Sequence, residues 1–129
     1  MKVVHCLILG LALAASASLT SVAQQNNPYK GNWLAKFMTR GGDPGGATVV
    51  VKDSGGTWTS KNTSAGNPCL GLDWPFAVTR ATTDIFEISI NKSKAMRGCG
   101  KLNLTFKRVD GKTLEGQFSD GRKVTLERQ

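Results

Sequence analysis

The chain has 129 residues, one histidine, three cysteines and a formal net charge of +8. This length suits one small domain, and the excess of lysine and arginine favours anionic partners. A single histidine leaves little material for Ser-His-Asp or Cys-His catalysis, or for imidazole-rich metal sites.

Residues 1–23 have the pattern of a cleaved signal peptide. A basic start precedes an apolar run over residues 7–17, and residues 21–23 form a small-x-small cleavage site, with residues 15–17 as an alternative. The apolar run is too short to span a membrane comfortably. We therefore expect an exported protein, periplasmic or secreted, that begins at Gln24 and has no transmembrane segment.

Cleavage removes the only histidine and leaves two cysteines. His5 and Cys6 are lost, and the loss of Lys2 lowers the net charge from +8 to +7. Cys69 and Cys99 are then an even pair in an oxidising compartment, which predicts one disulfide. With neither imidazole nor free thiol, we expect a non-enzymatic protein without cofactor or metal. A hydrolase that uses a carboxylate pair is the remaining enzymatic alternative.

The rest of the chain predicts strands and no helix. Residues 24–30 are expected to be a flexible arm in front of one domain at residues 31–129. Alternating apolar and polar residues, or short apolar runs, predict five strands at residues 33–38, 48–53, 57–61, 76–80 and 84–91. The segments between them are irregular or glycine-rich, and the longest cover residues 40–46, 62–75 and 92–100.

Residues 101–128 predict three more antiparallel strands. Asp-Gly pairs separate them, and keeping the apolar faces together favours three-residue loops at residues 109–111 and 119–121. Each loop is predicted to be a type I turn closed by a left-handed glycine.

This choice of loops fixes the pairing of the last three strands. It places Phe106 opposite Leu114 and puts Gly116 between Leu104 and Val124, where a missing side chain lets the sheet bend. The interior is then filled by seven apolar side chains: Phe86, Ile88, Ile90, Leu102, Leu104, Phe106 and Phe118.

Eight strands with short connections predict an all-β, antiparallel up-and-down meander, closed as a small filled barrel. A β-sandwich is the alternative fold. In a meander the connections alternate between two ends, so all the long ones fall at one end. The predicted disulfide joins two of these long connections.

The long-loop end is also rich in cations and carries two large apolar side chains. Loops on a rigid scaffold commonly carry binding sites. We expect a basic binding surface for an anionic macromolecule or a protein at the cell envelope, with no nucleic acid as partner and a monomeric protein. Solvated charges at a turn-rich rim are the alternative interpretation. The candidate residues are Arg40, Lys61, Trp74, Lys92, Lys94, Met96, Arg97, Lys101 and Arg122.

Gly31-Asn32-Trp33, at the start of the first predicted strand, resembles the opening motif of lipocalins and related calycin barrels, including avidin-like ones. The resemblance implies that Trp33 closes one barrel end against an arginine from a late strand, a part that Arg128 would take. It also implies an alternative function as a carrier of small apolar ligands. The size, signal peptide and single disulfide are similar to those of small periplasmic metalloprotease inhibitors, which implies that the partner is a protease or another hydrolase.

Overall fold

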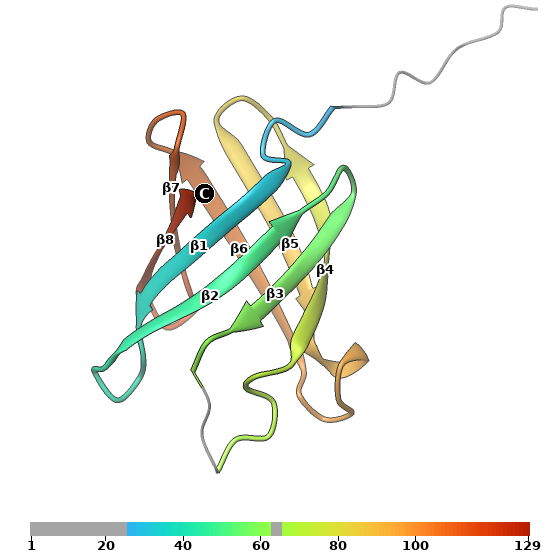
Figure 1. Ribbon diagram of the computed structural model, residues 1–129, viewed down its shortest axis with the longest axis vertical. Coiled ribbons are helices and arrows are strands. Elements are labelled where there is room, and N and C mark those ends of the chain that lie inside the picture. The colour runs from blue at the N-terminus through green and yellow to red at the C-terminus, as the bar shows by residue number, and fades with distance from the viewer. Residues whose placement is uncertain (1–25, 63–65) are drawn as a thin grey trace, which may run out of the picture.

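The computed structural model describes residues 26–62 and 66–129, so the predicted signal peptide lies outside the described residues. The described residues form eight strands and one short 3-10 turn, η1 (Lys92–Lys94), and Figure 1 shows how the strands are arranged. None of the helices within the described ranges has the length and apolar character needed to cross a membrane. The strands are β1 (Gly31–Met38), β2 (Pro44–Val51), β3 (Gly55–Ser60), β4 (Asp73–Ala81), β5 (Ile85–Asn91), β6 (Lys101–Arg108), β7 (Thr113–Gln117) and β8 (Lys123–Arg128).

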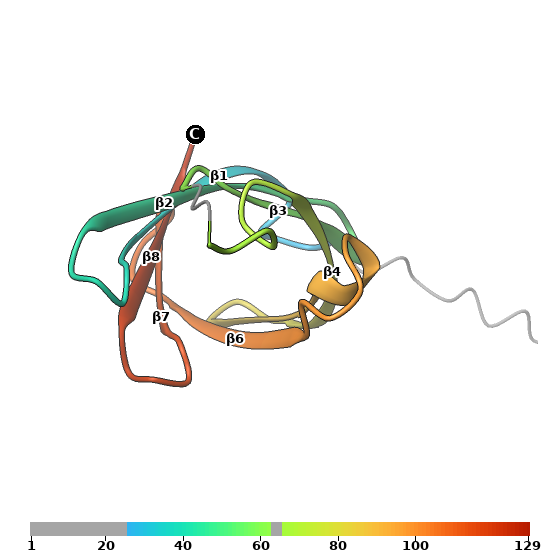
Figure 2. The same cartoon turned by 90° about the horizontal axis from the view of Figure 1, so that it is seen from below.

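The strands form a closed antiparallel barrel in sequence order, from β1 to β8. Closure comes from β1, which pairs with β2 on one side and with β8 on the other. Figure 2 shows the resulting ring of strands from the long-loop end. The predicted meander barrel is therefore confirmed, and the sandwich alternative is wrong.

Two predicted loops are shorter than expected because strand pairing extends into them. β2 begins at Pro44, and Gly45 pairs with Phe37 of β1. A Cβ on Gly45 would lie 2.6 Å from the Phe37 ring, so glycine allows this close pairing. β4 begins at Asp73 and includes Pro75, which pairs only with β3, because pairing with β5 starts one residue later. A missing N–H is tolerated where one side of a strand has no partner.

Side chains that point inward along each strand fill most of the barrel. The continuous valine run of β2 is divided by this alternation: Val49 and Val51 are buried, whereas Val50 is half-buried and faces outward. The buried apolar residues of the strands are Trp33, Ala35, Ala47, Val49, Val51, Trp58, Trp74, Phe76, Phe86, Ile88, Ile90, Leu104, Phe106, Leu114, Val124 and Leu126. Leu102 and Phe118, which were expected to complete this filling, are only half-buried.

The predicted pairing is right for β7 with β8 and wrong for β6 with β7. Gly116 lies opposite Val124, as expected. Across the other strand pair, however, Gly116 faces Phe106, a shift of two residues from the predicted partner Leu104. A shift of two keeps every side chain on its own face, so the apolar pattern does not distinguish the two pairings.

The two Asp-Gly turns also differ. Gly121 has the predicted left-handed conformation, with φ of +87°. Gly111 is not among the glycines with positive φ, so the predicted left-handed glycine bulge is wrong there. With Arg108 paired to Leu114, the connection between β6 and β7 is longer than the predicted three-residue loop.

The short-loop end of the barrel is closed by residues just before and after the strands. Tyr29 is only 2% exposed, and its ring centroid lies 4.8 Å from that of Phe86. Asn27 is buried and donates a hydrogen bond to the Lys52 carbonyl. The described part of the expected flexible arm is therefore packed against the barrel.

Trp33 and Arg128 complete this closure. The Arg128 guanidinium lies 4.3 Å from the centre of the Trp33 ring and donates hydrogen bonds to the carbonyls of Lys30 and Pro28. The Trp33 indole N–H donates to the Tyr29 carbonyl. This is the contact that the resemblance to lipocalins implied for the two residues.

Candidate binding site at the long-loop end

A disulfide ties together two of the connections at the long-loop end. Cys69, between β3 and β4, is bonded to Cys99, between β5 and β6, with a Cα–Cα distance of 5.7 Å. The predicted disulfide is confirmed. Trp74 is held beside this disulfide, because its indole N–H donates a 2.8 Å hydrogen bond to the Cys69 carbonyl.

A pocket of about 470 Å³ lies at this end of the barrel. It extends from the connecting loops down to the core. Its polar lining includes Ser60, Asn62 and Asn67, so hydrogen-bonding groups lie beside an apolar surface. Its apolar wall is formed by six aromatic or aliphatic side chains: Phe37, Trp58, Leu70, Trp74, Leu102 and Phe118.

The aromatic rings of the wall are held by one another. Trp58 is 1% exposed, and its ring centroid lies 6.5 Å from that of Phe37. Phe37 in turn meets Phe118 edge to face at 5.3 Å. These contacts fix the positions of Phe37 and Phe118, which are only partly buried and so offer apolar surface to anything that enters the pocket.

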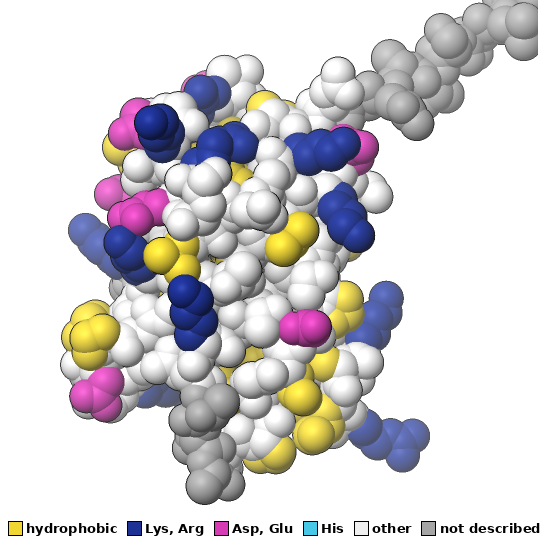
Figure 3. Space-filling model, in the orientation of Figure 1, with side chains coloured by type: hydrophobic (Ala, Val, Ile, Leu, Met, Phe, Trp, Pro, Cys, Tyr) yellow, Lys and Arg dark blue, Asp and Glu magenta, His cyan; other side chains and the backbone are white. Residues whose placement is uncertain are grey.

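Cations line the mouth of the pocket. The ammonium of Lys92 lies 5.3 Å from the centre of the Trp74 ring, within the range of a cation–π contact. Arg40 and Arg122 lie on the β1–β2 connection and at the end of the β7–β8 connection, and both line the pocket with Asp120. Figure 3 shows hydrophobic side chains and lysines or arginines close together near the lower, long-loop end of the molecule.

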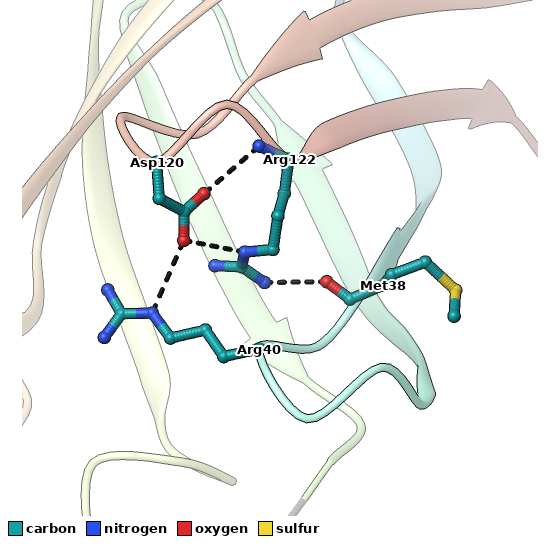
Figure 4. A network of polar contacts seen from close by, with 4 residues as sticks. All are labelled: Met38, Arg40, Asp120 and Arg122. Carbon is teal, nitrogen blue, oxygen red and sulfur yellow. Dashed lines mark hydrogen bonds and ion pairs between the residues drawn. The ribbon is translucent and has the colours of Figure 1, made fainter.

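Arg122 fastens the β7–β8 connection to the end of β1 (Figure 4). Its guanidinium donates a 2.7 Å hydrogen bond to the Met38 carbonyl and a 2.8 Å hydrogen bond to the Asp120 carboxylate. Its flat face also lies 4.6 Å from the centre of the Phe118 ring. Arg40 makes a longer contact of 3.4 Å with the same carboxylate, and its side chain is largely exposed.

These contacts set the charge of the rim. Hydrogen bonds from the Arg122 side chain and backbone lower the pKa of Asp120 below the ordinary value for aspartate. The carboxylate is therefore ionised at neutral pH. The rim also carries three cations, Arg40, Lys92 and Arg122, so its net charge is +2.

The predicted binding residues divide into three groups. Arg40, Trp74, Lys92 and Arg122 line the pocket. Lys94 and Lys101 instead line a smaller depression of about 230 Å³ on the outer surface. Lys61, Met96 and Arg97 are exposed and line neither one.

Several wall residues were not among the predicted site residues. Leu102 and Phe118 were assigned to the filled interior because their alternation points them inward. Both lie near the strand ends at the long-loop end, where the interior is open. That position is the signal which distinguishes them from core residues deeper in the barrel.

No group of three or more His, Cys, Asp or Glu side chains within the described ranges is arranged to hold a metal ion. The residues that line the pocket at the long-loop end offer aromatic surface, hydrogen bonding and positive charge.

No protein-family model matches the chain, and a search of curated proteins finds no match. Among solved structures, a redesigned β-barrel is similar, with a TM-score of 0.50 and 18% identity, over 85% of this chain and 99% of that chain. At this identity the likeness shows the fold alone. The chain is an eight-stranded antiparallel β-barrel that resembles a designed barrel, and no family is identified.

Proposed function

We propose that this protein is a non-enzymatic binding module that holds a small amphipathic anion at its long-loop end. The observation that carries the proposal is the aromatic pocket with a cationic rim. An apolar part of the ligand would lie against Phe37 and Phe118, and its acidic group would face the rim.

The size and lining of the pocket support a small molecule. Sites for such ligands span about 300–1,000 Å³ and combine mostly apolar walls with a few polar groups. The pocket, at about 470 Å³, falls in this range, and it combines an apolar wall of six side chains with a polar and charged rim.

The arrangement of charge supports an acidic ligand. Arg122 is already bound to Asp120 and Met38, whereas Arg40 makes only the long ion pair. Lys92 has no ion pair among the described residues, and its ammonium stands over Trp74. Arg40 and Lys92 are therefore the groups available to an incoming carboxylate, sulfonate or phosphate.

Isothermal titration calorimetry with 8-anilinonaphthalene-1-sulfonate tests this proposal, with the uncharged N-phenyl-1-naphthylamine as the comparison. We expect the anion to bind about tenfold more tightly, because a charge-assisted hydrogen bond contributes about 1.5–3 kcal/mol. The Lys92→Gln variant should remove most of that preference. Equal affinities for the two compounds would contradict an anion site.

A pocket-filling variant tests the location of binding. Leu102→Trp places a larger side chain on the pocket wall, whereas Leu34→Trp places the same side chain on a half-buried position of β1 away from the pocket. We expect only Leu102→Trp to abolish binding. Unchanged binding by Leu102→Trp would rule out this pocket.

A second candidate function is contact with an acidic macromolecule, including a secreted protease or hydrolase. The observation that favours it lies in the β5–β6 connection and at the first residue of β6. Lys94, Arg97 and Lys101 form no ion pair there among the described residues, and Met96 is 39% exposed. Lys94→Glu with Arg97→Glu should then weaken capture of the partner and leave 8-anilinonaphthalene-1-sulfonate binding unchanged. Unchanged capture would exclude this version.

Two further parts of the proposal concern the location of the protein and its relationship to known families. The disulfide and the signal-peptide pattern support export to the periplasm or the exterior. The stacking of Arg128 on Trp33 supports a relationship with lipocalin-like calycin barrels. Both parts are consistent with a carrier of small ligands.

A further inference from the structure

The barrel has a partly open seam between β6 and β7. β6 pairs with β5 along its whole length, from Lys101 to Lys107. Its pairing with β7 covers only three residue pairs and ends where Phe106 meets Gly116. Among the described strands, residues 101–105 of β6 therefore have a partner on one side only.

The hydrogen-bonding pattern of β6 shows which of its backbone groups face this seam. Arg108 donates its backbone N–H to the Asp84 carbonyl on the β5 side. Alternate residues of an antiparallel strand bond to opposite neighbours. The N–H and C=O groups of Lys101 and Asn103 consequently point away from β5, toward the seam. The Thr105 carbonyl approaches Gly116, where the pairing begins.

A cleft of about 600 Å³ lies along the seam. Polar side chains from β6, β7 and β8 line its outer part, and the inward-pointing Phe118 and Val124 are also in its lining. The lining contains the two cations Lys107 and Lys123 and one carboxylate, Glu115. Lys101 is the first residue of β6 and lies at the start of the same strand edge.

We propose that this seam binds an extended acidic peptide segment of a partner protein by strand addition to β6. An exposed strand edge offers its unpaired N–H and C=O groups to another extended chain. Alternate side chains of the added strand would contact Phe118, which is only partly buried, and the others would meet the lysines. The excess of Lys101, Lys107 and Lys123 over Glu115 favours acidic side chains at those outer positions.

This site is separate from the proposed function, because it uses the β6 edge and not the cationic rim. Phe118 lines both the pocket and the cleft. A test of the seam therefore relies on β6 backbone groups and leaves Phe118 unchanged.

Amide hydrogen exchange with a short blocked peptide of alternating glutamate and valine tests the proposal. We expect the Asn103 amide to exchange fast in the free protein and at least about tenfold more slowly with the peptide. A peptide of alternating lysine and valine should have no such effect. Slow exchange of Asn103 in the free monomer, or no slowing by the acidic peptide, would overturn the proposal.

Substitutions at one position separate backbone from side-chain effects. Asn103→Pro removes the N–H that faces the seam and keeps the bonds to β5, since proline is tolerated at strand edges. It should weaken peptide binding at least about tenfold, whereas Asn103→Ala should bind like the wild type. Equal binding by Asn103→Pro would contradict strand addition.

A second variant covers the outcome in which Asn103→Pro does not fold. Lys107→Glu with Lys123→Glu keeps the backbone and reverses the charge of the cleft, so it should abolish binding of the acidic peptide. Protection of Asn103 that rises with protein concentration and needs no peptide would identify a second copy as the occupant and overturn the acidic-peptide proposal. In both variants 8-anilinonaphthalene-1-sulfonate should still bind, which distinguishes failure here from failure of the proposed function.

Discussion

Two arginines hold opposite ends of the barrel by the same means. Arg128 lies over Trp33 and donates to backbone carbonyls near the N-terminus of the barrel. Arg122 lies over Phe118 and donates to the Met38 carbonyl. A planar guanidinium can stack on a ring and hydrogen-bond at its edge, which a lysine ammonium does not do. One contact completes a closed end, whereas the other holds a wall of the open pocket.

Gly116 is a position where any side chain is predicted to cost stability. A Cβ there would lie 2.7 Å from the Thr105 carbonyl oxygen and 2.8 Å from Cδ1 of Phe106. We expect Gly116→Ala to lower the free energy of unfolding by about 1–3 kcal/mol, measured by urea denaturation. Gly111→Ala is the matched control, since its nearest neighbour is 3.8 Å away at Arg108, and its effect should stay within about 0.5 kcal/mol. Equal effects of the two substitutions would contradict the β6–β7 pairing.

Asp120 is predicted to stabilise the folded protein at neutral pH and to lose this contribution in acid. Its pKa is lowered in the folded state, first by the Arg122 side chain and then by the Arg122 backbone N–H. A lowered pKa contributes stability above the unfolded-state pKa, and this contribution is lost as the pH falls through the folded-state value. The difference in unfolding free energy between wild type and Asp120→Asn should therefore shrink between about pH 7 and about pH 3. A difference that does not change with pH would contradict this role.

At the scale of elements, the disulfide stabilises two long connections and the pocket wall between them. The bonded cysteines are 30 residues apart. In the chain-entropy model, a loop of this length contributes roughly 3.5 kcal/mol. Because Trp74 is bound to the Cys69 carbonyl, the same bond also positions an aromatic wall.

Replacing both cysteines by serine tests this contribution without leaving a free thiol. We expect the free energy of unfolding to fall by roughly 3.5 kcal/mol, measured by urea denaturation against the oxidised wild type. The variant should also bind 8-anilinonaphthalene-1-sulfonate more weakly. A stability loss below about 1 kcal/mol would show that the long connections are held by other contacts.

Sequence patterns predict the strands well and one of their pairings poorly. Alternation along β5 and β6 identifies both strands and their buried faces, because a half-buried strand repeats every two residues. The same two-residue period cannot reveal that the register between β6 and β7 is shifted by two residues. That register depends on tertiary packing, since Phe106 occupies the space that a side chain at position 116 would need.

At the scale of the whole molecule, the two ends of the barrel differ. Tyr29, Trp33 and Arg128 seal the short-loop end, whereas the long-loop end opens into the pocket. A meander places alternate connections at the same end, and the long connections of this chain are alternate ones, so this asymmetry was predictable. The pocket itself was not, because alternation says that Leu102 points inward but not whether side chains from the other strands reach the same depth.

The central claim is that a small amphipathic anion binds in the pocket at the long-loop end. The most direct test is the ¹H–¹⁵N spectrum of the indole N–H groups during titration with 8-anilinonaphthalene-1-sulfonate. Trp58 and Trp74 line the pocket, and Trp33 lies at the sealed end under Arg128. The proposed site predicts shifts of the Trp58 and Trp74 signals and an unchanged Trp33 signal. Shifts confined to Trp33, or no shift in any of the three, would contradict the claim.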